Sequence, residues 1–133
     1  MAKNGEQILQ VEGVSKRYGG VRALDNVRFD LNYGEVHALV GENGAGKSTL
    51  IKVLGGIVPR DAGRIVFEGR EVVFHTPAEA QDAGIAIIHQ ELSMMPSLSV
   101  MENLFMSSLG RAGGLVSWRE LRRRAREALA LVD

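Results

Sequence analysis

Residues 41–49 read GENGAGKST, which places three glycines, one lysine and two hydroxyl side chains directly before an apolar run of helical character. Residues 36–40 precede them as a nearly continuous apolar run, typical of a strand that is covered on both faces. Glycine lets the backbone curl where a side chain would clash. The segment therefore predicts an α/β fold in which a buried strand turns into a helix around a bound group.

The spacing Gly41-x-x-x-x-Gly46-Lys47-Ser48 matches the phosphate-binding loop, or P-loop. Its backbone N–H groups and the N-terminus of the following helix would hold phosphate oxygens. Lys47 would reach the β and γ phosphates, Ser48 would place its hydroxyl on Mg²⁺, and Thr49 would lie beside the α phosphate. The predicted nucleotide-binding residues of this loop are Gly41, Glu42, Asn43, Gly44, Ala45, Gly46, Lys47, Ser48 and Thr49.

Strand signals occur on both sides of this loop. Val27, Phe29 and Leu31 alternate with polar residues, which is the period of a half-buried strand and favours an antiparallel start to the fold. Residues 65–74, IVFEGREVVF, place Gly69-Arg70 between two apolar runs and predict a type II′ hairpin. Residues 85–90, IAIIHQ, predict a further buried strand.

Three helix starts share one pattern, in which a hydroxyl residue is followed three positions later by glutamate. The hydroxyl caps a free amide, and the glutamate returns to the amide of the capping residue. These starts lie at Thr76, Ser99 and Ser117, and the first of the three helices is expected to end at Gly84. The glycine-rich residues 110–114 are expected to separate two subdomains. In the last helix, one apolar stripe is expected to contain Trp118, Leu121, Ala125, Ala128, Leu129 and Val132.

The composition limits the remaining possibilities. The chain has 133 residues, which suits one domain, with 16 basic and 16 acidic side chains and no cysteine. Balanced charge argues against nucleic acid or anionic lipid as a partner, because both need a concentrated basic face. The absence of cysteine excludes disulfides and thiolate metal sites. No apolar run approaches the ~20 residues of a membrane span, and residues 1–6 lack an apolar leader, so secretion is not expected.

Three segments together resemble the ATP-binding subunit of ABC transporters: GENGAGKSTLIKVLGGI at 41–57, AGIAIIHQEL at 83–92 and LSVMENLF at 98–105. More narrowly, they are similar to subunits that energise bacterial uptake of monosaccharides such as ribose, galactose and xylose. The resemblance runs from about Ile8 onward. It implies a P-loop NTPase core with an N-terminal antiparallel β-subdomain over about residues 8–91, then the start of a helical subdomain over about residues 92–133. The chain would be the N-terminal part of the first of two nucleotide-binding domains.

The resemblance also implies roles for two residues outside the P-loop. Tyr18 falls where the family keeps an aromatic ring that stacks on adenine, whereas its sequence context alone favours packing in a turn. Gln90 matches the glutamine that helps to hold Mg²⁺ and the attacking water, although a glutamine after a strand is otherwise an ordinary loop residue. The implied catalytic residues are Lys47 and Gln90, the implied Mg²⁺ ligands are Ser48 and Gln90, and the implied cofactors are ATP and Mg²⁺.

The implied partners are membrane-spanning permease subunits and a second nucleotide-binding domain, at the cytoplasmic face of the inner membrane. Residues 92–104 would contact the permease, since residues 93–106 contain four methionines and methionine adapts to irregular surfaces. Core packing of these methionines is an equal alternative. The arginines among residues 122–126 are interpreted as a solvated helix face, and nucleic acid is not an expected partner.

The chain also departs from the family pattern. The signature loop written around Ser-Gly-Gly-Gln, the Walker B strand and the switch histidine would all follow later, so the fold is expected to be truncated before them. Residues 128–133, ALALVD, are not interpreted as Walker B because they continue the helical period, and none of the three histidines is given a catalytic role. We therefore expect weak nucleotide binding, negligible hydrolysis, and self-association through an apolar strand edge beside residues 85–90, IAIIHQ.

Two other functions fit parts of the pattern. A small-molecule kinase would use a lid arginine from residues 119–126, but such enzymes tend to begin with the P-loop, whereas this chain places a β-rich segment before it. A phosphorylated acceptor would identify such a kinase. A non-enzymatic docking fragment would use the same fold without binding nucleotide, so nucleotide binding distinguishes it from an ATPase.

Overall fold

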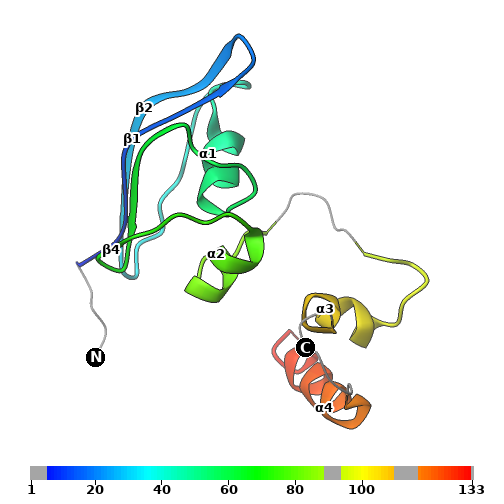
Figure 1. Ribbon diagram of the computed structural model, residues 1–133. Coiled ribbons are helices and arrows are strands. Elements are labelled where there is room, and N and C mark those ends of the chain that lie inside the picture. Colours follow the sequence, from blue (N-terminus) through cyan, green and yellow to red (C-terminus); the bar gives the residue numbers. More distant parts are fainter. Residues whose placement is uncertain (1–5, 89–93, 110–116, 133) are drawn as a thin grey trace. The chain divides into compact units, whose positions relative to one another are not determined.

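The computed structural model describes residues 6–88, 94–109 and 117–132, and the chain divides into two compact units, Met1–Ile88 and His89–Asp133. The first unit contains a sheet and two helices, and the second contains a pair of helices (Figure 1). Within the described ranges, no helix combines the length and the apolar character that a membrane crossing requires.

The sheet of the first unit has four antiparallel strands in the order β2-β1-β3-β4. Its strands are β1 (Gln7–Tyr18), β2 (Val21–Asn32), β3 (Ala62–Phe67) and β4 (Arg70–Glu71). The two long strands form one hairpin, and β3 pairs along the other edge of β1. The alternation at Val27, Phe29 and Leu31 is confirmed, because all three lie in β2 and pack against the hydrophobic core.

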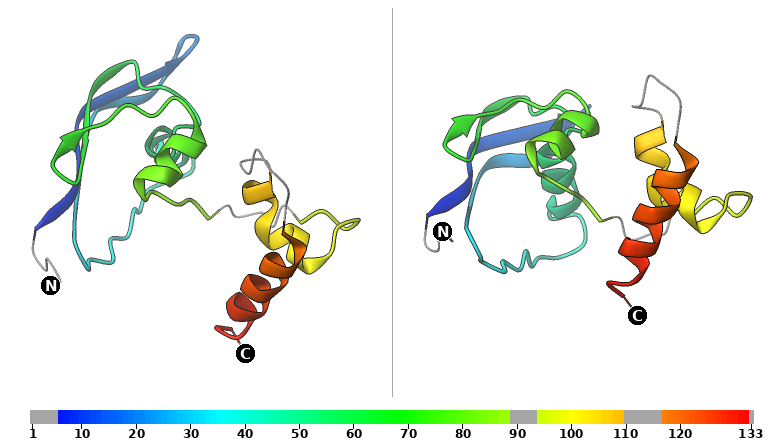
Figure 2. Two further views of the ribbon diagram at one scale, coloured as in Figure 1. Left: turned by 60° about the horizontal axis from the view of Figure 1, so that its bottom comes forward. Right: turned by 90° about the horizontal axis from the view of Figure 1, so that it is seen from below.

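The core lies between one face of this sheet and helix α1 (Lys47–Leu54), which Figure 2 shows against the sheet. Alternate side chains of β1 point inward, since the side-chain period of a strand is two. The helix contributes Leu50 and Val53, which are three positions apart and therefore share a face. The buried core residues are Leu9, Val11, Val14, Leu24, Leu50, Val53 and Ile65.

Helix α2 (Pro77–Ala83) begins and ends where the sequence predicts. The Thr76 hydroxyl accepts a hydrogen bond from the Glu79 amide at 3.3 Å, and Gly84 ends the helix with a positive φ of 109°. The return contact differs from the expected one, because the Glu79 carboxylate accepts from the His75 amide at 2.9 Å and from the Thr76 hydroxyl at 3.2 Å. The carboxylate therefore satisfies an amide one residue earlier than a simple capping box would.

The turn between β3 and β4 is not the predicted type II′ turn. Phe67 pairs with Arg70, so the two central residues are Glu68 and Gly69, and both have positive φ, at 49° and 74°. Two positive φ values define a type I′ turn. Glu68 is held in this conformation because its amide donates to Ile8 O at 2.8 Å and its carboxylate accepts from the Tyr33 hydroxyl at 3.0 Å.

The two predicted buried strands are also wrong for the residues that the structure describes. Residues 36–40 and 85–88 form no strand, and Val36, Val40 and Ile88 have exposed fractions of 99%, 90% and 96%. A buried parallel strand needs neighbouring strands for its backbone hydrogen bonds. The strands of the described residues are all used in the antiparallel sheet, which leaves no neighbour for these segments.

The second unit contains α3 (Val100–Leu109) and α4 (Trp118–Leu129). Ser99 and Glu102 form the predicted reciprocal cap, with the Ser99 amide donating to the Glu102 carboxylate at 2.8 Å and the Glu102 amide donating back to the Ser99 hydroxyl at 3.3 Å. In α4 the Ser117 hydroxyl accepts from the Glu120 amide at 3.4 Å. Both predicted helix starts are therefore confirmed.

The apolar stripe of α4 is narrower than predicted. Leu121 and Ala125 are buried, whereas Trp118, Leu129 and Val132 are exposed. Helix α4 packs against α3 in this unit, and a single neighbouring helix buries fewer of its side chains than a complete core would. Residues 128–132 form the end of α4 and a turn, so the described part of ALALVD is no buried strand, which agrees with its rejection as Walker B.

Candidate nucleotide site

The predicted P-loop lies between β2 and α1, and its glycines take conformations that other residues avoid. Gly44 and Gly46 have φ values of 87° and 89°, and the Ala45 amide donates to Glu42 O at 3.2 Å to close a turn. Lys47 is the first residue of α1. The chain therefore curls immediately before the helix, as phosphate binding requires.

Gly46 fixes this loop to the sheet. A Cβ at this position would collide with the carbonyl oxygen of Ala23 in β2 and would lie 3.0 Å from Leu24 Cδ2. The helix that follows has no side-chain cap at Gly46 and no acidic residue in its first turn. Neither the cap position nor the first turn of α1 therefore supplies an anion that would compete for its first amides and the positive end of its dipole.

The Lys47 side chain closes the loop. Its ammonium donates to the carbonyl oxygens of Gly41 at 2.6 Å and Glu42 at 2.8 Å. An ammonium has three N–H donors, so one is left for an anion. Gly41 also has to be small, because a Cβ there would lie 3.3 Å from Ala45 Cβ. Lys47 thus joins the start of the P-loop to the start of α1 and presents its charge inside the loop.

The other P-loop residues differ in exposure. Ser48 is exposed and Thr49 is half-buried, while the exposed remainder of the loop consists of Gly41, Glu42, Asn43, Gly44 and Ala45. These residues fit a phosphate group, since the donor set is backbone amides, one ammonium and two hydroxyls. The Ser48 hydroxyl is the ligand that we expect this loop to offer Mg²⁺, and Mg²⁺ in phosphate sites takes most of its ligands from phosphate and water.

Tyr18 is the last residue of β1, where the β1–β2 hairpin turns. It pairs with Val21, two residues before the Ala23 carbonyl that meets Gly46, and 45% of its surface is exposed. The Lys16 ammonium lies 5.7 Å from the centre of the Tyr18 ring. The tyrosine ring is therefore accessible on the same hairpin that supports the P-loop.

Lys16 and Asp61 form a support that sequence reasoning missed. Lys16 is only 9% exposed, and its ammonium donates to Asp61 Oδ1 at 2.7 Å, while the Arg17 amide donates to Asp61 Oδ2 at 2.7 Å. Both bonds lower the pKa of the Asp61 carboxyl, and the bond from Lys16 has the larger effect. They tie the end of β1, and with it Tyr18, to the segment before β3. The two residues are 45 positions apart, so no local pattern indicates their contact.

The remaining predicted site residue, Gln90, and the neighbouring His89 lie outside the described residues. His37 makes local contacts, with its Nδ1 at 2.8 Å from a Glu35 carboxylate oxygen and its ring edge-on to Phe29. The Glu35 pKa is lowered, chiefly by the Asn32 amide and then by His37. In residues 6–88, 94–109 and 117–132 no three or more acidic or histidine side chains are placed to hold a metal ion.

The methionine-rich segment of the second unit forms an exposed apolar groove of about 450 Å³. The Asn103 side chain fixes the backbone of this segment through several hydrogen bonds. Its oxygen accepts from the Met95 amide at 2.8 Å, and its amide nitrogen lies 3.1 Å from the carbonyl oxygens of Met95, Leu98 and Ser99. The residues that line the groove are Met94, Met95, Pro96, Leu98, Val100, Asn103 and Leu104.

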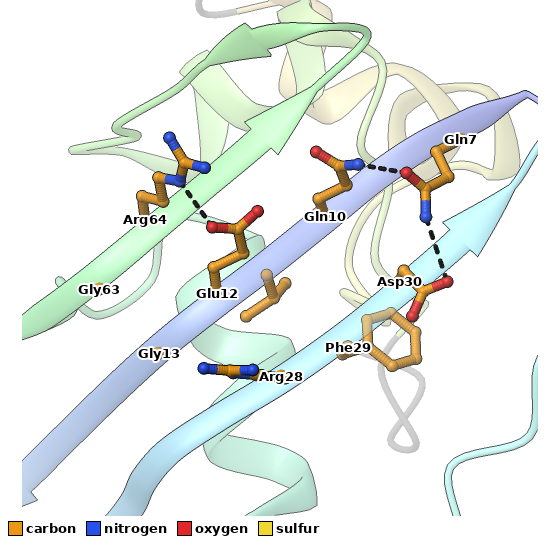
Figure 3. A pocket seen from close by; sticks show the side chains of 10 residues that line it. Gln7, Gln10, Glu12, Gly13, Arg28, Phe29, Asp30, Gly63 and Arg64 are labelled. Atoms are coloured by element: carbon orange, nitrogen blue, oxygen red, sulfur yellow. Dashed lines mark hydrogen bonds and ion pairs between the residues drawn. The ribbon is translucent and has the colours of Figure 1, made fainter.

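A larger open hollow, of about 790 Å³, lies on the outer face of the sheet (Figure 3). Two hydrogen bonds join polar side chains of its lining: Arg64 donates to Glu12 at 2.7 Å, and Gln7 donates to Asp30 at 3.4 Å. The bond from Arg64 is the main cause of the lowered pKa of Glu12. The hollow contains none of the predicted site residues, so we do not assign the nucleotide to it.

Comparisons with known proteins identify the family of the chain. Residues 24–133 match the ABC transporter family. The chain is 52% identical over 123 residues to a ribose import ATP-binding protein of Mesorhizobium japonicum, covering 92% of this chain and 24% of that protein. It is 51% identical over 121 residues to an arabinose import ATP-binding protein of Paraburkholderia xenovorans, covering 91% of this chain and 23% of that protein.

A solved structure described as a dimeric bacterial ABC transporter cassette has the same fold. It superposes with a TM-score of 0.73 at 26% identity, over 92% of this chain and 56% of that one. The chain spans about a quarter of the length of the curated relatives that it matches first. The antiparallel sheet, the P-loop before α1 and these matches lead to one conclusion: the chain belongs to the ABC transporter family.

Proposed function

We propose that this chain binds Mg²⁺-ATP through residues 41–49. The observation that carries the proposal is the start of α1: Gly46 is fitted against Ala23, the first helical turn has no acidic residue, and the Lys47 ammonium lies inside the loop. A unit charge pair at ~4 Å is worth roughly 4 kcal/mol at an effective dielectric of about 20, before desolvation. Lys47 is therefore the residue whose removal should weaken binding most.

We assign the other binding roles by chemistry. The amides of residues 44–49 hold phosphate oxygens, and Ser48 supplies one Mg²⁺ ligand. The exposed Tyr18 ring stacks on adenine, a contact typically worth ~1–3 kcal/mol. Gln90 supplies the second Mg²⁺ ligand and positions the attacking water. Bound Mg²⁺-ATP supplies the phosphoryl group, and the contribution of this chain is position and positive charge.

We further propose that the complete protein is an ATPase that energises the import of a monosaccharide. Two relatives are named for the import of different sugars, ribose and arabinose, and this supports the class of substrate and no single sugar. The first unit would be the β-subdomain with the P-loop, and the second the start of a helical subdomain. A second nucleotide-binding domain would complete the catalytic site.

The groove of the second unit is our candidate for permease contact. Exposed Met94, Met95 and Val100 line it, and Asn103 keeps its floor in place. Methionine side chains adapt to irregular apolar surfaces. Contact with a membrane-spanning permease would hold the protein at the cytoplasmic face of the inner membrane.

The 133-residue chain by itself should bind nucleotide weakly and hydrolyse it negligibly, because Lys47, Ser48 and Gln90 are only part of the apparatus that phosphoryl transfer needs. Repeated turnover of ATP by the purified chain, lost in Lys47→Ala, would overturn this proposal.

Calorimetric titration of the chain with Mg²⁺-ATP tests the proposed binding. We expect heat of binding from the unsubstituted chain and none from Lys47→Ala. Lys52→Ala is the matched control, since Lys52 is an exposed lysine of the last turn of the same helix. Equal binding by all three chains, or by none, would reject the assignment.

A further inference from the structure

Helix α4 carries a local charge that the balanced whole-chain composition hides. Residues Trp118–Leu129 contain five arginines and two glutamates. The side of the helix with Leu121 and Ala125 is buried, and the arginines lie on the exposed remainder. A concentrated basic face is therefore present, although the net formal charge of the chain is zero.

Two of these arginines are engaged within the second unit. Arg123 pairs with Glu120 at 2.5 Å and with Glu127 at 2.6 Å, and it lowers the pKa of Glu120. The Arg124 guanidinium lies 4.8 Å from the centre of the Phe105 ring. Both side chains already have a partner inside the chain.

The other three arginines share one exposed stripe. Arg119, Arg122 and Arg126 are three and four positions apart, which places them on the same side of a helix. Across the described residues, none of these three side chains has an ion pair or a hydrogen-bond partner. From Arg119 to Arg126 the stripe covers eight residues, or about 10 Å at the rise of an α-helix.

Exposed apolar side chains continue this stripe toward both ends of α4. Trp118 is 49% exposed and lies one turn before Arg122, and Leu129 is 45% exposed and lies three positions after Arg126. Tryptophan is enriched at membrane–water interfaces, and helices that lie in the interface carry arginine or lysine on their polar face. The basic stripe, as used below, consists of Trp118, Arg119, Arg122, Arg126 and Leu129.

We propose that the basic stripe of α4 binds the headgroups of anionic phospholipids. The three arginines are spread over eight residues of the helix and line one open hollow of about 630 Å³, which also contains Glu120, Arg123 and Glu127. A long, open basic surface of this kind suits a layer of many phosphates better than one free phosphate. The apolar ends suit the boundary between headgroups and acyl chains. This surface is independent of the P-loop and gives the second unit a lipid contact of its own.

Co-sedimentation of the full chain with vesicles tests the proposal. We expect binding to vesicles of equal parts phosphatidylcholine and phosphatidylglycerol, none to phosphatidylcholine alone, and loss of binding as salt is raised. Replacement of Arg119, Arg122 or Arg126 by glutamine should each weaken binding by roughly fivefold. The single tryptophan, Trp118, should also shift its fluorescence to shorter wavelength on the mixed vesicles.

Arg124→Gln is the matched control, because it removes the same charge from a guanidinium that faces Phe105. Circular dichroism confirms that each variant retains its helices. No binding to the mixed vesicles at low salt, or equal weakening by Arg124→Gln and Arg122→Gln, would overturn the proposal. Binding of polyglutamate in place of vesicles would do the same, since it would identify an acidic peptide site. Lys47→Ala should bind vesicles normally, so a failure of nucleotide binding leaves this test intact.

Discussion

The carbonyl oxygen of Ala23 occupies the space where a Cβ of Gly46 would stand, and this contact sets where α1 begins against β2. Gly46 also has a φ of 89°, which a residue with a side chain rarely adopts. Two independent requirements therefore demand glycine at the last position before the helix. The geometry of the P-loop depends on the antiparallel hairpin as much as on the loop itself.

Gly46→Ala should destabilise the first unit more than Gly44→Ala does. Both glycines have positive φ, and the left-handed conformation costs a residue with a side chain roughly 1–2 kcal/mol. A Cβ on Gly44 meets nothing within 4 Å, whereas one on Gly46 meets the Ala23 backbone. Urea unfolding of the two variants measures the difference. Equal losses of unfolding free energy would show that the contact with β2 is not formed.

Leu50→Ala should lower the unfolding free energy by about 2–5 kcal/mol, because it leaves a cavity in the core between α1 and the sheet. Ile51→Ala, at the next position, is the control. Because Ile51 is 44% exposed, its replacement should lower the unfolding free energy much less. Guanidinium unfolding followed by circular dichroism distinguishes the two. A larger loss at Ile51 would place the other face of α1 against the sheet.

The bond between Lys16 and Asp61 should make stability depend on pH. The pKa of Asp61 is lowered in the folded chain from its ordinary value of 3.8, so its contribution is present above that value and is lost as the pH falls through the folded pKa. Asp61→Asn should therefore lower stability at neutral pH and have little effect in strong acid. Unfolding curves at several pH values test this. When Lys16→Met is also present, the pH-dependent effect of Asp61→Asn on stability should shrink. An undiminished effect would show that another group lowers the pKa of Asp61.

The chain should associate with itself through the apolar residues 36–40. Val36 and Val40 are almost fully exposed and make no strand pairing in the described sheet. Contiguous exposed apolar side chains invite contact with another chain. Sedimentation equilibrium should show association that Val40→Lys weakens and that Val21→Lys, an exposed position on the β1–β2 hairpin, leaves unchanged. A monomer at high concentration would contradict this prediction.

Elements that depend on neighbouring residues could be predicted from the sequence. The alternation in β2, the hydroxyl caps of Thr76, Ser99 and Ser117, and the helix end at Gly84 are all local patterns, and the structure confirms them. The return contact of the glutamate is confirmed at Ser99 and differs at Thr76. The start of α1 after the P-loop is equally local, because glycine spacing and the apolar helix positions indicate it together.

Features that depend on distant residues could not be predicted in this way. An apolar run such as residues 36–40 indicates burial, but a strand forms only where a neighbour supplies hydrogen bonds. The β3–β4 turn type depends on the pairing of Phe67 with Arg70, and glycine alone does not determine it. The contact between Lys16 and Asp61 joins residues 45 positions apart. The positions of Gln90 and of adenine on Tyr18 stay predictions.

The most direct test of the central claim is to record the backbone amide resonances of the isotope-labelled chain while Mg²⁺-ATP is added. If the P-loop binds phosphate, the largest shifts should occur at residues 44–49 and should be absent in Lys47→Ala. Unchanged amides at residues 44–49, or larger shifts around Glu12 and Arg64 on the outer face of the sheet, would contradict the account.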